Sequence, residues 1–450
     1  MFTERYRSHH DAENRLAELL DPGRGSGGMM RGSPLLRRLF RLLGLKPPAG
    51  HWKELEKILR EKPAQKNAGV YIHVPYCDKI CSFCNLNRTE RKGADLDAYT
   101  GYLVSEIKKW GGYPYIQGQH IESVYFGGGT PTVLNTGQFQ TILSALKDHF
   151  PLTGDCEISV ESTQHNLGVK KAAALEAAGV NRFSIGIQTF SDRGRRLLAR
   201  TYSEKKAKEE LLALRKNFGG VLGIDIIYSY PDQSLDEIRQ DAEMCISSRI
   251  DSVSFYSLMI QKGSALSNAL EQNELTFKRD IDFDLQRHNL FYKTLTEAGF
   301  NLLELSKLAR PDRDRYRYIH IQYGDGDLIP IGSGAGGTVA GFPVYSMAPG
   351  RRMTAAPNPR YEKYHRILGM LQFGVYDPEV ICGELGPQVT DAIGGAMAPL
   401  EKEGLLEPFT SEGRQAWKLS ADGVFWGNNI AVTILDAAIK AENSNAGKGV

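Results

Sequence analysis

Residues 70–84 read VYIHVPYCDKICSFC, a β-rich run that leads directly into three cysteines. The stretch VYIHV (70–74) predicts a short strand. Cys77, Cys81 and Cys84 follow it with the spacing C-x3-C-x2-C. In barrels and open parallel sheets alike, chemistry collects at the carboxyl ends of the strands. We therefore expect this loop to be a functional site.

Further short β-rich runs follow the first one, and helical patterns separate them. Strands are predicted at residues 123–126, 157–160, 183–188, 223–228 and 252–258. Amphipathic helices are predicted between them, at residues 96–110, 137–150, 169–179, 204–218 and 235–248. Strands that alternate with helices at spacings of about 25 to 50 residues indicate βα units and a parallel sheet. These six strands are more than half of an eightfold α/β barrel.

The composition is that of a globular protein with a sizeable core, since the 450 residues are 41% hydrophobic and 24% charged. There are 55 Lys and Arg against 53 Asp and Glu, a net charge of +2, which excludes a global basic field and predicts no nucleic-acid partner. No run approaches the roughly 18 apolar residues of a membrane span, and the N-terminus has no apolar signal region. We therefore expect a cytoplasmic protein.

The chain is expected to have three regions. Residues 1–65 are an N-terminal extension with a leucine-lined helix at 35–43, which either packs on the core or acts as a substrate lid through its arginines. Residues 66–300 are the βα core. Residues 301–450 form a C-terminal α+β domain, in which a helix at 398–407, a short hairpin and a final helix resemble a winged helix.

The cysteine loop indicates an iron–sulfur cluster. Six cysteines are too few for a disulfide scaffold in a chain of this size, and three of them lie within eight residues. Structural zinc takes four ligands, whereas the next cysteine after Cys84, which is Cys156, lies 72 residues further on. A [4Fe–4S] cluster with three protein thiolates leaves one iron open for an exogenous ligand. An open position indicates catalysis; the alternative is three buried thiols without a metal.

In these features the sequence resembles the radical S-adenosylmethionine (radical SAM) enzymes, which have C-x3-C-x2-C at the end of a first strand and an aromatic, here Phe83, before the third cysteine. More narrowly, the sequence resembles the HemN/HemW-like branch, the class C radical SAM methylases and their relatives, from about residue 66 to at least residue 340. The motifs that carry this resemblance are YIHVPYC, CSFC, GGGTPT and Q-x-F. The resemblance implies a partial (β/α)6 TIM-like barrel with a HemN-like C-terminal domain. It also implies a [4Fe–4S] cluster that cleaves S-adenosylmethionine to a 5′-deoxyadenosyl radical.

The resemblance assigns residues to the cluster and to the S-adenosylmethionine on its open iron. Cys77, Cys81 and Cys84 would be the metal ligands. Around the first S-adenosylmethionine the family has a tyrosine near the sulfonium, an aromatic beside the adenine, a glycine-rich segment at the methionine moiety and a carboxylate. The matching residues are Tyr71, Phe83, Gly128, Gly129, Thr130 and Glu161.

In the HemN-like branch a second S-adenosylmethionine lies near the first, held by residues that match Gln188, Arg200 and Asp225 here. Each has a plain alternative: Gln188 as a strand-end cap, Arg200 as a helix-surface charge and Asp225 as a buried ion-pair partner. Asp225 lies among isoleucines and must be paired or functional, because an unpaired buried charge is costly. Met259 is expected to line the same pocket on a weaker match. Tyr71 and Gln188 are the expected catalytic residues.

Departures from the relatives narrow the expected activity. Leu86 stands where oxygen-independent coproporphyrinogen dehydrogenases have a fourth cysteine, which counts against that decarboxylation. About 70 residues precede the cluster strand, whereas HemW-type haem-binding proteins begin a few residues before it. Ser229 replaces an expected glycine in YSYP. The long extension, Leu86 and GSGAGG (332–337) together resemble the HutW/ChuW-type enzymes, the anaerobilin synthases, which methylate and open haem anaerobically to a linear tetrapyrrole with release of iron.

Four functions are therefore considered: a haem-opening methyltransferase, a methylase or cyclopropanase for another sp² substrate, a coproporphyrinogen III dehydrogenase, and a HemW-type haem chaperone. The expected partners are haem or a related porphyrin and a low-potential electron donor such as flavodoxin or a reductase. Candidate cations for the substrate's propionates are Arg37, Arg38, Arg41, Arg310 and Arg313. The candidate haem ligands are His9, His10, His165 and His320. For each of these histidines, a surface or core role is the simpler interpretation.

Overall fold

The computed structural model describes residues 50–61, 66–84, 87–411 and 413–446. Of the expected N-terminal extension it shows α4 (Trp52–Leu59), in which Trp52 packs edge-on against Trp110 with the ring centroids 5.9 Å apart. Several residues singled out in the sequence lie outside the described residues: the helix expected at 35–43 with Arg37, Arg38 and Arg41, and also His9, His10 and Leu86.

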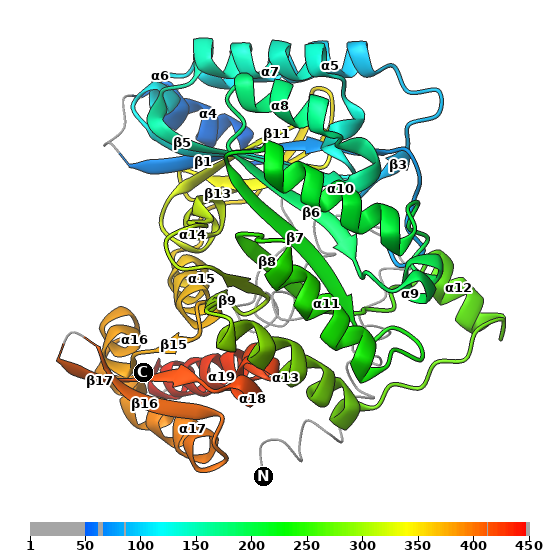
Figure 1. Ribbon diagram of the computed structural model, residues 1–450. Helices are drawn as coiled ribbons and strands as arrows, with labels where there is room; N and C mark the ends of the chain where they lie inside the picture. The colour runs from blue at the N-terminus through cyan, green and yellow to red at the C-terminus, as the bar shows by residue number, and fades with distance from the viewer. Residues whose placement is uncertain (1–49, 62–65, 85–86, 412, 447–450) are drawn as a thin grey trace.

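A nine-stranded sheet dominates the described chain (Figure 1), with the order β11-β1-β4-β5-β6-β7-β8-β10-β9. Its centre is six parallel strands at the predicted positions: β1 (Asn67–Val74), β4 (His120–Gly128), β5 (Leu152–Thr163), β6 (Arg182–Gln188), β7 (Val221–Tyr228) and β8 (Ser252–Ser257). β11 (Asp327–Ile331) continues the parallel sheet beside β1. β10 (Lys307–Ala309) and β9 (Asn301–Glu304) continue it antiparallel beyond β8. The predicted partial α/β barrel is confirmed.

Helices cover the outer face of this sheet (Figure 1): α5 (Leu96–Gly111), α7 (Thr136–His149), α8 (Val169–Ala177), α10 (Glu204–Asn217), α11 (Leu235–Ser247) and α13 (Ile281–Glu297). Two of them begin at a reciprocal capping box, Asn135 with Gln138 at α7 and Ser234 with Glu237 at α11. Such a box satisfies backbone N–H groups that the first helical turn leaves without partners. The capping residues in the local sequence thus determine where these two helices begin in the connections between parallel strands.

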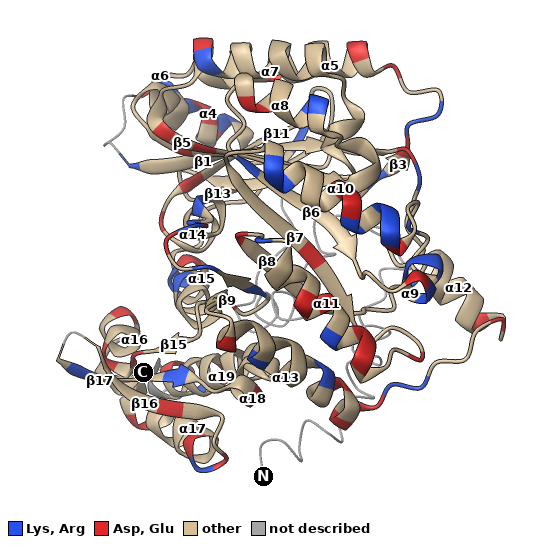
Figure 2. Cartoon of the chain, viewed as in Figure 1, with Lys and Arg blue, Asp and Glu red and all other residues tan. Residues whose placement is uncertain are grey.

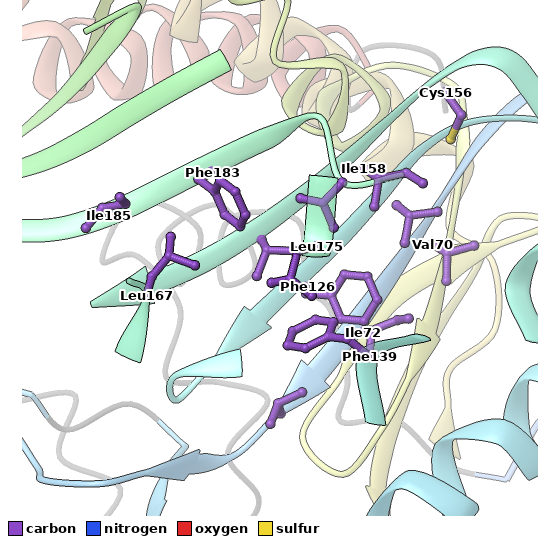
Figure 3. Close-up of a cluster of buried hydrophobic side chains, with 14 of the residues drawn as sticks. Val70, Ile72, Phe126, Phe139, Cys156, Ile158, Leu167, Leu175, Phe183 and Ile185 are labelled. Carbon is purple, nitrogen blue, oxygen red and sulfur yellow. The ribbon is translucent and has the colours of Figure 1, made fainter. Parts of the chain in front are cut away.

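The main core lies between the sheet and the helices. Figure 3 shows side chains of β1, β4 and β6 meeting those of α7 and α8, among them the fully buried Val70, Phe126, Phe139, Leu175 and Phe183. Because successive side chains of a strand point to opposite faces, the residues between these face the barrel interior. The interior residues are polar or aromatic: Tyr71, His73, Tyr125, Glu161, Ser184 and Asp225. The outer face of each strand supplies packing, and the inner face supplies reactive groups.

The C-terminal part of the chain contains a second core. The sheet of β12 (Gly336–Val339), β13 (Phe342–Ala348) and β14 (Arg351–Thr354) still contributes to the first core. The second core is built by α15 (Pro359–Gln372), α16 (Pro378–Leu385), α17 (Thr390–Lys402), α18 (Ala421–Phe425) and α19 (Gly427–Ala446) with β15 (Val375–Tyr376), β16 (Leu406–Ser411) and β17 (Arg414–Leu419).

The expected boundary at residue 300 does not coincide with this change of core. The first core continues to Val344 and the second begins at Tyr364, because β9, β10 and β11 complete the main sheet. The helix predicted at 398–407 is wrong in its bounds, since α17 ends at Lys402 and the residues from Leu406 pair in a hairpin. A hairpin followed by a final helix is present as expected.

Shorter elements lie in the connections between the main strands and helices: β2 (Tyr76–Cys77), β3 (Thr89–Glu90), α6 (Pro114–Gln117), α9 (Asp192–Leu197), α12 (Ala265–Glu271) and α14 (Arg317–Tyr323). Figure 2 shows basic and acidic residues intermingled over the outer helices, as the balanced composition predicts. Among the described residues, no helix is both long and apolar enough to span a membrane.

Arginine pairs hold the end of the barrel where the strands begin. Arg182 donates through Nε and Nη2 to both oxygens of Asp314, each at 2.9 Å. Arg313 Nε donates to Asp251 at 2.8 Å, and Arg310 Nε donates to the carbonyl of Ile250 at 3.0 Å. Arg310 and Arg313, candidates for the substrate's propionates, are therefore held at the end of the barrel opposite the cysteine loop. Because β10 is antiparallel to β8, the chain after it emerges at the opposite end of the barrel.

We expect the Asp314→Asn variant to be less stable than the parent by about 3 kcal/mol, because it leaves the buried Arg182 guanidinium without its carboxylate. Arg182 holds the pKa of Asp314 well below its usual range. The parent should therefore lose this contribution as the pH falls below the usual carboxyl pKa, and the variant should not. Urea denaturation at several pH values measures both effects. The control is Glu209→Gln, which removes an exposed partner of Lys205 and should change stability little; equal effects of the two substitutions would contradict the prediction.

Candidate active site

The three cysteines follow β1 at the carboxyl end of the sheet. None of the three is part of a disulfide; Cys77 is buried, and Cys81 and Cys84 are half-buried. Two hydrogen bonds of Ser82 fix the loop: its side-chain hydroxyl donates to the carbonyl of Leu197 at 2.7 Å, and its carbonyl accepts from the N–H of Leu266 at 2.8 Å. The loop is therefore anchored by the end of α9 and the start of α12, and its thiols need not serve as structural anchors.

These thiols fit an iron–sulfur cluster. In the part of the chain that the structure describes, no three His, Cys, Asp or Glu side chains gather as tightly as a single metal ion requires. A cubane attaches each thiolate to a different iron, so its sulfur ligands stand further apart than those of a single metal ion. Burial raises the pKa of the Cys77 thiol, and the hydroxyl of Thr130, 3.5 Å from its sulfur, opposes that effect. Arg200 Nη1 lies 3.0 Å from Cys81 Sγ, so a guanidinium group contacts the second cysteine of the loop.

The glycine-rich segment at the end of β4, Gly127 to Gly129, has no room for side chains. A Cβ on Gly128 would lie 2.7 Å from the His73 ring, and one on Gly129 would lie 2.7 Å from the carbonyl oxygen of Tyr76. Gly128 also has a φ of +116°, which favours glycine. The bare backbone allows the ends of β1 and β4 to approach closely, and the N–H of Gly128 faces Glu161 Oε2 at 3.3 Å.

Glu161 lies among aromatic and polar groups of the barrel interior. The hydroxyl of Tyr125 donates to Glu161 Oε1 at 2.7 Å. Burial raises the pKa of Glu161 to about 7, and the hydrogen bond from Tyr125 only partly opposes this. Near neutral pH the carboxyl group therefore exists in both protonation states, and a ligand with donor groups would favour the ionised one.

Tyr71 and His73 form a hydrogen-bonded pair on the inner face of β1. The hydroxyl oxygen of Tyr71 is 3.0 Å from His73 Nδ1, and His73 Nε2 is 3.0 Å from the carbonyl oxygen of Asn87. A carbonyl only accepts, so Nε2 carries the proton and Nδ1 accepts from Tyr71. Burial lowers the pKa of His73, which keeps the imidazole neutral. The sequence analysis missed His73, although strand alternation places it on the same face as Tyr71.

Gln188 and Arg200 meet at the end of β6. Gln188 has a φ of +74°, a conformation that a non-glycine residue adopts rarely. Arg200 Nη2 donates to the carbonyl of Gly186 at 2.5 Å while its Nη1 reaches Cys81. Arg200 is thus a link between β6 and the cysteine loop and not a helix-surface charge. Asp225 on β7 accepts from the Ser184 hydroxyl at 3.3 Å, on the same inner face.

A buried network that the sequence analysis missed fixes the turn after Gln188. The carboxylate of Asp241, which is fully buried, accepts from the backbone N–H of Phe190 at 2.6 Å and from the Thr189 hydroxyl at 2.9 Å. Arg195 Nη1 donates to the carbonyl of Thr189 at 2.8 Å. These bonds hold the backbone on the carboxyl side of Gln188 and so maintain its left-handed conformation.

The remaining predicted residues take different places. Phe83 packs on a small apolar cluster that includes Leu198 and Tyr230. Met259, just after β8, is 53% exposed at the carboxyl end of the barrel. His165 makes an edge contact with Tyr202, and His320 stacks on Phe373 at 4.5 Å between ring centroids, away from the cysteine loop.

The chain is similar in sequence to known proteins. Residues 71–245 match the model of the Radical SAM superfamily. The chain is 27% identical over 392 residues to anaerobilin synthase of Escherichia coli O157:H7, which covers 84% of this chain and 85% of that protein. It is 30% identical over 283 residues to the heme chaperone HemW of Escherichia coli K12, which covers 61% of this chain and 70% of that one.

The fold is similar to a solved structure as well. Coproporphyrinogen III oxidase (HemN) from Escherichia coli superposes with a TM-score of 0.70 at 22% identity. The superposition covers 86% of this chain and 93% of that one. At this identity the likeness concerns the fold, including the C-terminal part that lies outside residues 71–245.

We expect Cys77→Ser, Cys81→Ser and Cys84→Ser each to abolish stable iron loading during anaerobic reconstitution, because the cluster would lose one of three thiolates. Iron and sulfide per chain and the charge-transfer absorption of the cluster are the measurements. The control is Cys382→Ser, in the second core region and remote from the loop, which should load iron like the parent. Full loading of any one loop variant, or loss of loading in the control, would contradict the assignment.

Proposed function

Because the chain belongs to the HemN/HemW-like branch of the radical SAM superfamily, we propose that it is a haem-opening methyltransferase of that branch. In this proposal it methylates haem with S-adenosylmethionine under anaerobic conditions and opens the ring to a linear tetrapyrrole with release of iron. The observation that carries it is similarity to anaerobilin synthase along 84% of the chain, a longer match than the 61% that aligns with HemW.

The superfamily implies a [4Fe–4S] cluster and S-adenosylmethionine, which together supply an electron and a carbon-centred radical when bound. For the first S-adenosylmethionine, Cys77, Cys81 and Cys84 would hold the cluster. The chain's other groups would bind and orient the cofactor: the backbone of the glycine segment along the methionine moiety, Glu161 on its polar groups, and aromatic rings at the sulfonium and adenine. These residues are Gly128, Gly129, Thr130, Glu161, Tyr71 and Phe83.

Gln188, Arg200 and Asp225 would hold a second S-adenosylmethionine, the methyl donor. Support comes from three positions: Gln188 ends β6, Arg200 joins the Gly186 carbonyl of β6 to Cys81, and Asp225 accepts from Ser184 on the inner face. The strained backbone at Gln188, maintained by the Asp241 network, also supports a functional role, because strain persists where the surroundings enforce it.

The substrate would enter at the carboxyl end of the barrel. Tyr256 and Met259, at the end of β8, are large apolar side chains that are 40% and 53% exposed, and a flat tetrapyrrole could lie on them. The electron would come from a low-potential donor such as flavodoxin or a reductase.

A second candidate function is haem delivery, as in a HemW-type chaperone. The 30% identity to HemW, over 70% of that protein, favours it. The same cluster and cofactor pocket would then serve a regulatory role. The two functions differ in whether bound haem is consumed.

The test is anaerobic incubation of the reconstituted protein with haem, S-adenosylmethionine and a low-potential reductant. We expect loss of the haem Soret band, release of iron and formation of S-adenosylhomocysteine. Stoichiometric haem binding without turnover would instead support the chaperone. Release of carbon dioxide from coproporphyrinogen would support a dehydrogenase, and cofactor turnover with intact haem would support another sp² substrate.

The Gln188→Ala variant tests the second cofactor position. We expect deoxyadenosine still to form, from abortive cleavage of the first cofactor, while S-adenosylhomocysteine falls at least tenfold, a ratio that ordinary destabilisation would not change. Quantifying both nucleosides by chromatography in one reaction gives that ratio. Gln140→Ala on the exposed face of α7 is the matched control. Parallel loss of both products in the Gln188 variant would count against a separate second site.

A further inference from the structure

Four tyrosine rings form a continuous stack through the barrel interior. Tyr71 lies 6.2 Å from Tyr125 and 6.0 Å from Tyr318, measured between ring centroids. Tyr125 and Tyr318 stack at 4.3 Å with an interplanar angle of 26°. Tyr316 lies 6.4 Å from Tyr125 and 6.2 Å from Tyr318. The stack runs from the glycine segment at the carboxyl end of the sheet to the Arg182–Asp314 pair at the other end.

The first two phenols have proton acceptors. Tyr71 donates to His73 Nδ1, and Tyr125 donates to Glu161 Oε1. Burial raises the pKa of all four phenols, so each keeps its proton near neutral pH and can be oxidised only by also giving that proton up. A Cβ on Gly127 would lie 3.1 Å from the Tyr71 hydroxyl oxygen and 3.2 Å from Glu161 Oε2, so that phenol and the carboxyl group face the same space beside the glycine.

Tyr316 differs from the other three because two cations lie over its ring. Arg182 Cζ is 4.5 Å and Lys307 Nζ is 4.9 Å from its centroid. Cations over an aromatic face oppose the loss of an electron from that ring. The ring that is hardest to oxidise is therefore the last one of the stack.

We propose that Tyr71, Tyr125 and Tyr318 form a radical trap, which receives the oxidising equivalent of a carbon-centred radical when no substrate is present to react with it, and that the cation-covered Tyr316 ends the trap. The trap rests on membership of the radical SAM superfamily and not on haem as the substrate. Its effect is to keep an unspent radical away from the cysteine loop.

The transfer balances in two steps. In the first, the phenolic O–H bond of Tyr71 breaks, and its hydrogen atom, released from the hydrogen bond to His73, forms a C–H bond on the carbon radical, which gives a closed-shell product and a neutral Tyr71 radical. In the second, an electron passes from the Tyr125 ring to Tyr71 and the Tyr125 proton passes to Glu161. Glu161 in turn protonates Tyr71, so one hydrogen atom in all has moved from Tyr125 to Tyr71. The unpaired electron then rests on the Tyr125–Tyr318 stack.

The experiment uses the cluster-loaded protein with S-adenosylmethionine and reductant and without haem, freeze-quenched for electron paramagnetic resonance. We expect a tyrosyl signal whose hyperfine pattern changes when the protein contains ring-deuterated tyrosine. Deoxyadenosine, measured in the same samples, separates two failures. If none forms, the radical function has failed; if it forms without a tyrosyl signal, the trap is wrong.

Substitutions by phenylalanine locate the radical while keeping the rings stacked. Tyr125→Phe should confine the signal to Tyr71 and change its hyperfine pattern, and Tyr71→Phe should abolish the signal relative to the deoxyadenosine formed. Tyr316→Phe is the matched control and should leave the signal unchanged. An unaltered signal in Tyr125→Phe, or its loss in Tyr316→Phe, would overturn the proposal. Thermal unfolding of each variant checks that the barrel is intact.

Discussion

The two-residue alternation of the parallel strands is the constraint on which the rest of the structure depends. Each central strand must bury its outer face against helices, and Val70, Phe126 and Phe183 do so with no exposed surface. The intervening residues are thereby committed to the barrel interior. A one-residue change of register would exchange the two faces, so stability and site are fixed by the same pairing.

Burying polar groups has electrostatic consequences, both in the barrel interior and where α11 covers the sheet. A carboxyl group withdrawn from water is less readily ionised, which is why the pKa values of Glu161 and Asp241 both rise to about 7. The chain compensates locally: Tyr125 donates to Glu161, and a backbone N–H and a hydroxyl donate to Asp241. The pKa of Asp314 is lowered instead, because its arginine partner, Arg182, is buried beside it. The interior thus combines neutralised and ion-paired groups.

The sequence alone was sufficient to predict the structural features that depend on the pattern of neighbouring residues. The six central strands, the helices between them and the cysteine loop follow from periodicity and spacing over a few residues. What could not be predicted depends on pairing at long range. The sequence offered Arg310 and Arg313 as candidates for binding a substrate. Because β10 is antiparallel to β8, they lie instead at the end of the barrel opposite the cysteine loop. β11 joins the main sheet beside β1 although more than 250 residues separate them, so the change of core lies beyond residue 300.

The same reasoning explains why His73 and Asp241 escaped the sequence analysis while Tyr71 and Gln188 did not. Tyr71 and Gln188 belong to motifs, whereas His73 and Asp241 act through other residues. His73 accepts from Tyr71 because the carbonyl of Asn87 fixes the proton on its other nitrogen. Asp241 acts on Gln188 through the backbone that follows it. Both effects require two elements to be packed together. A residue that positions another one is therefore visible only after the fold has determined which side chain lies beside which.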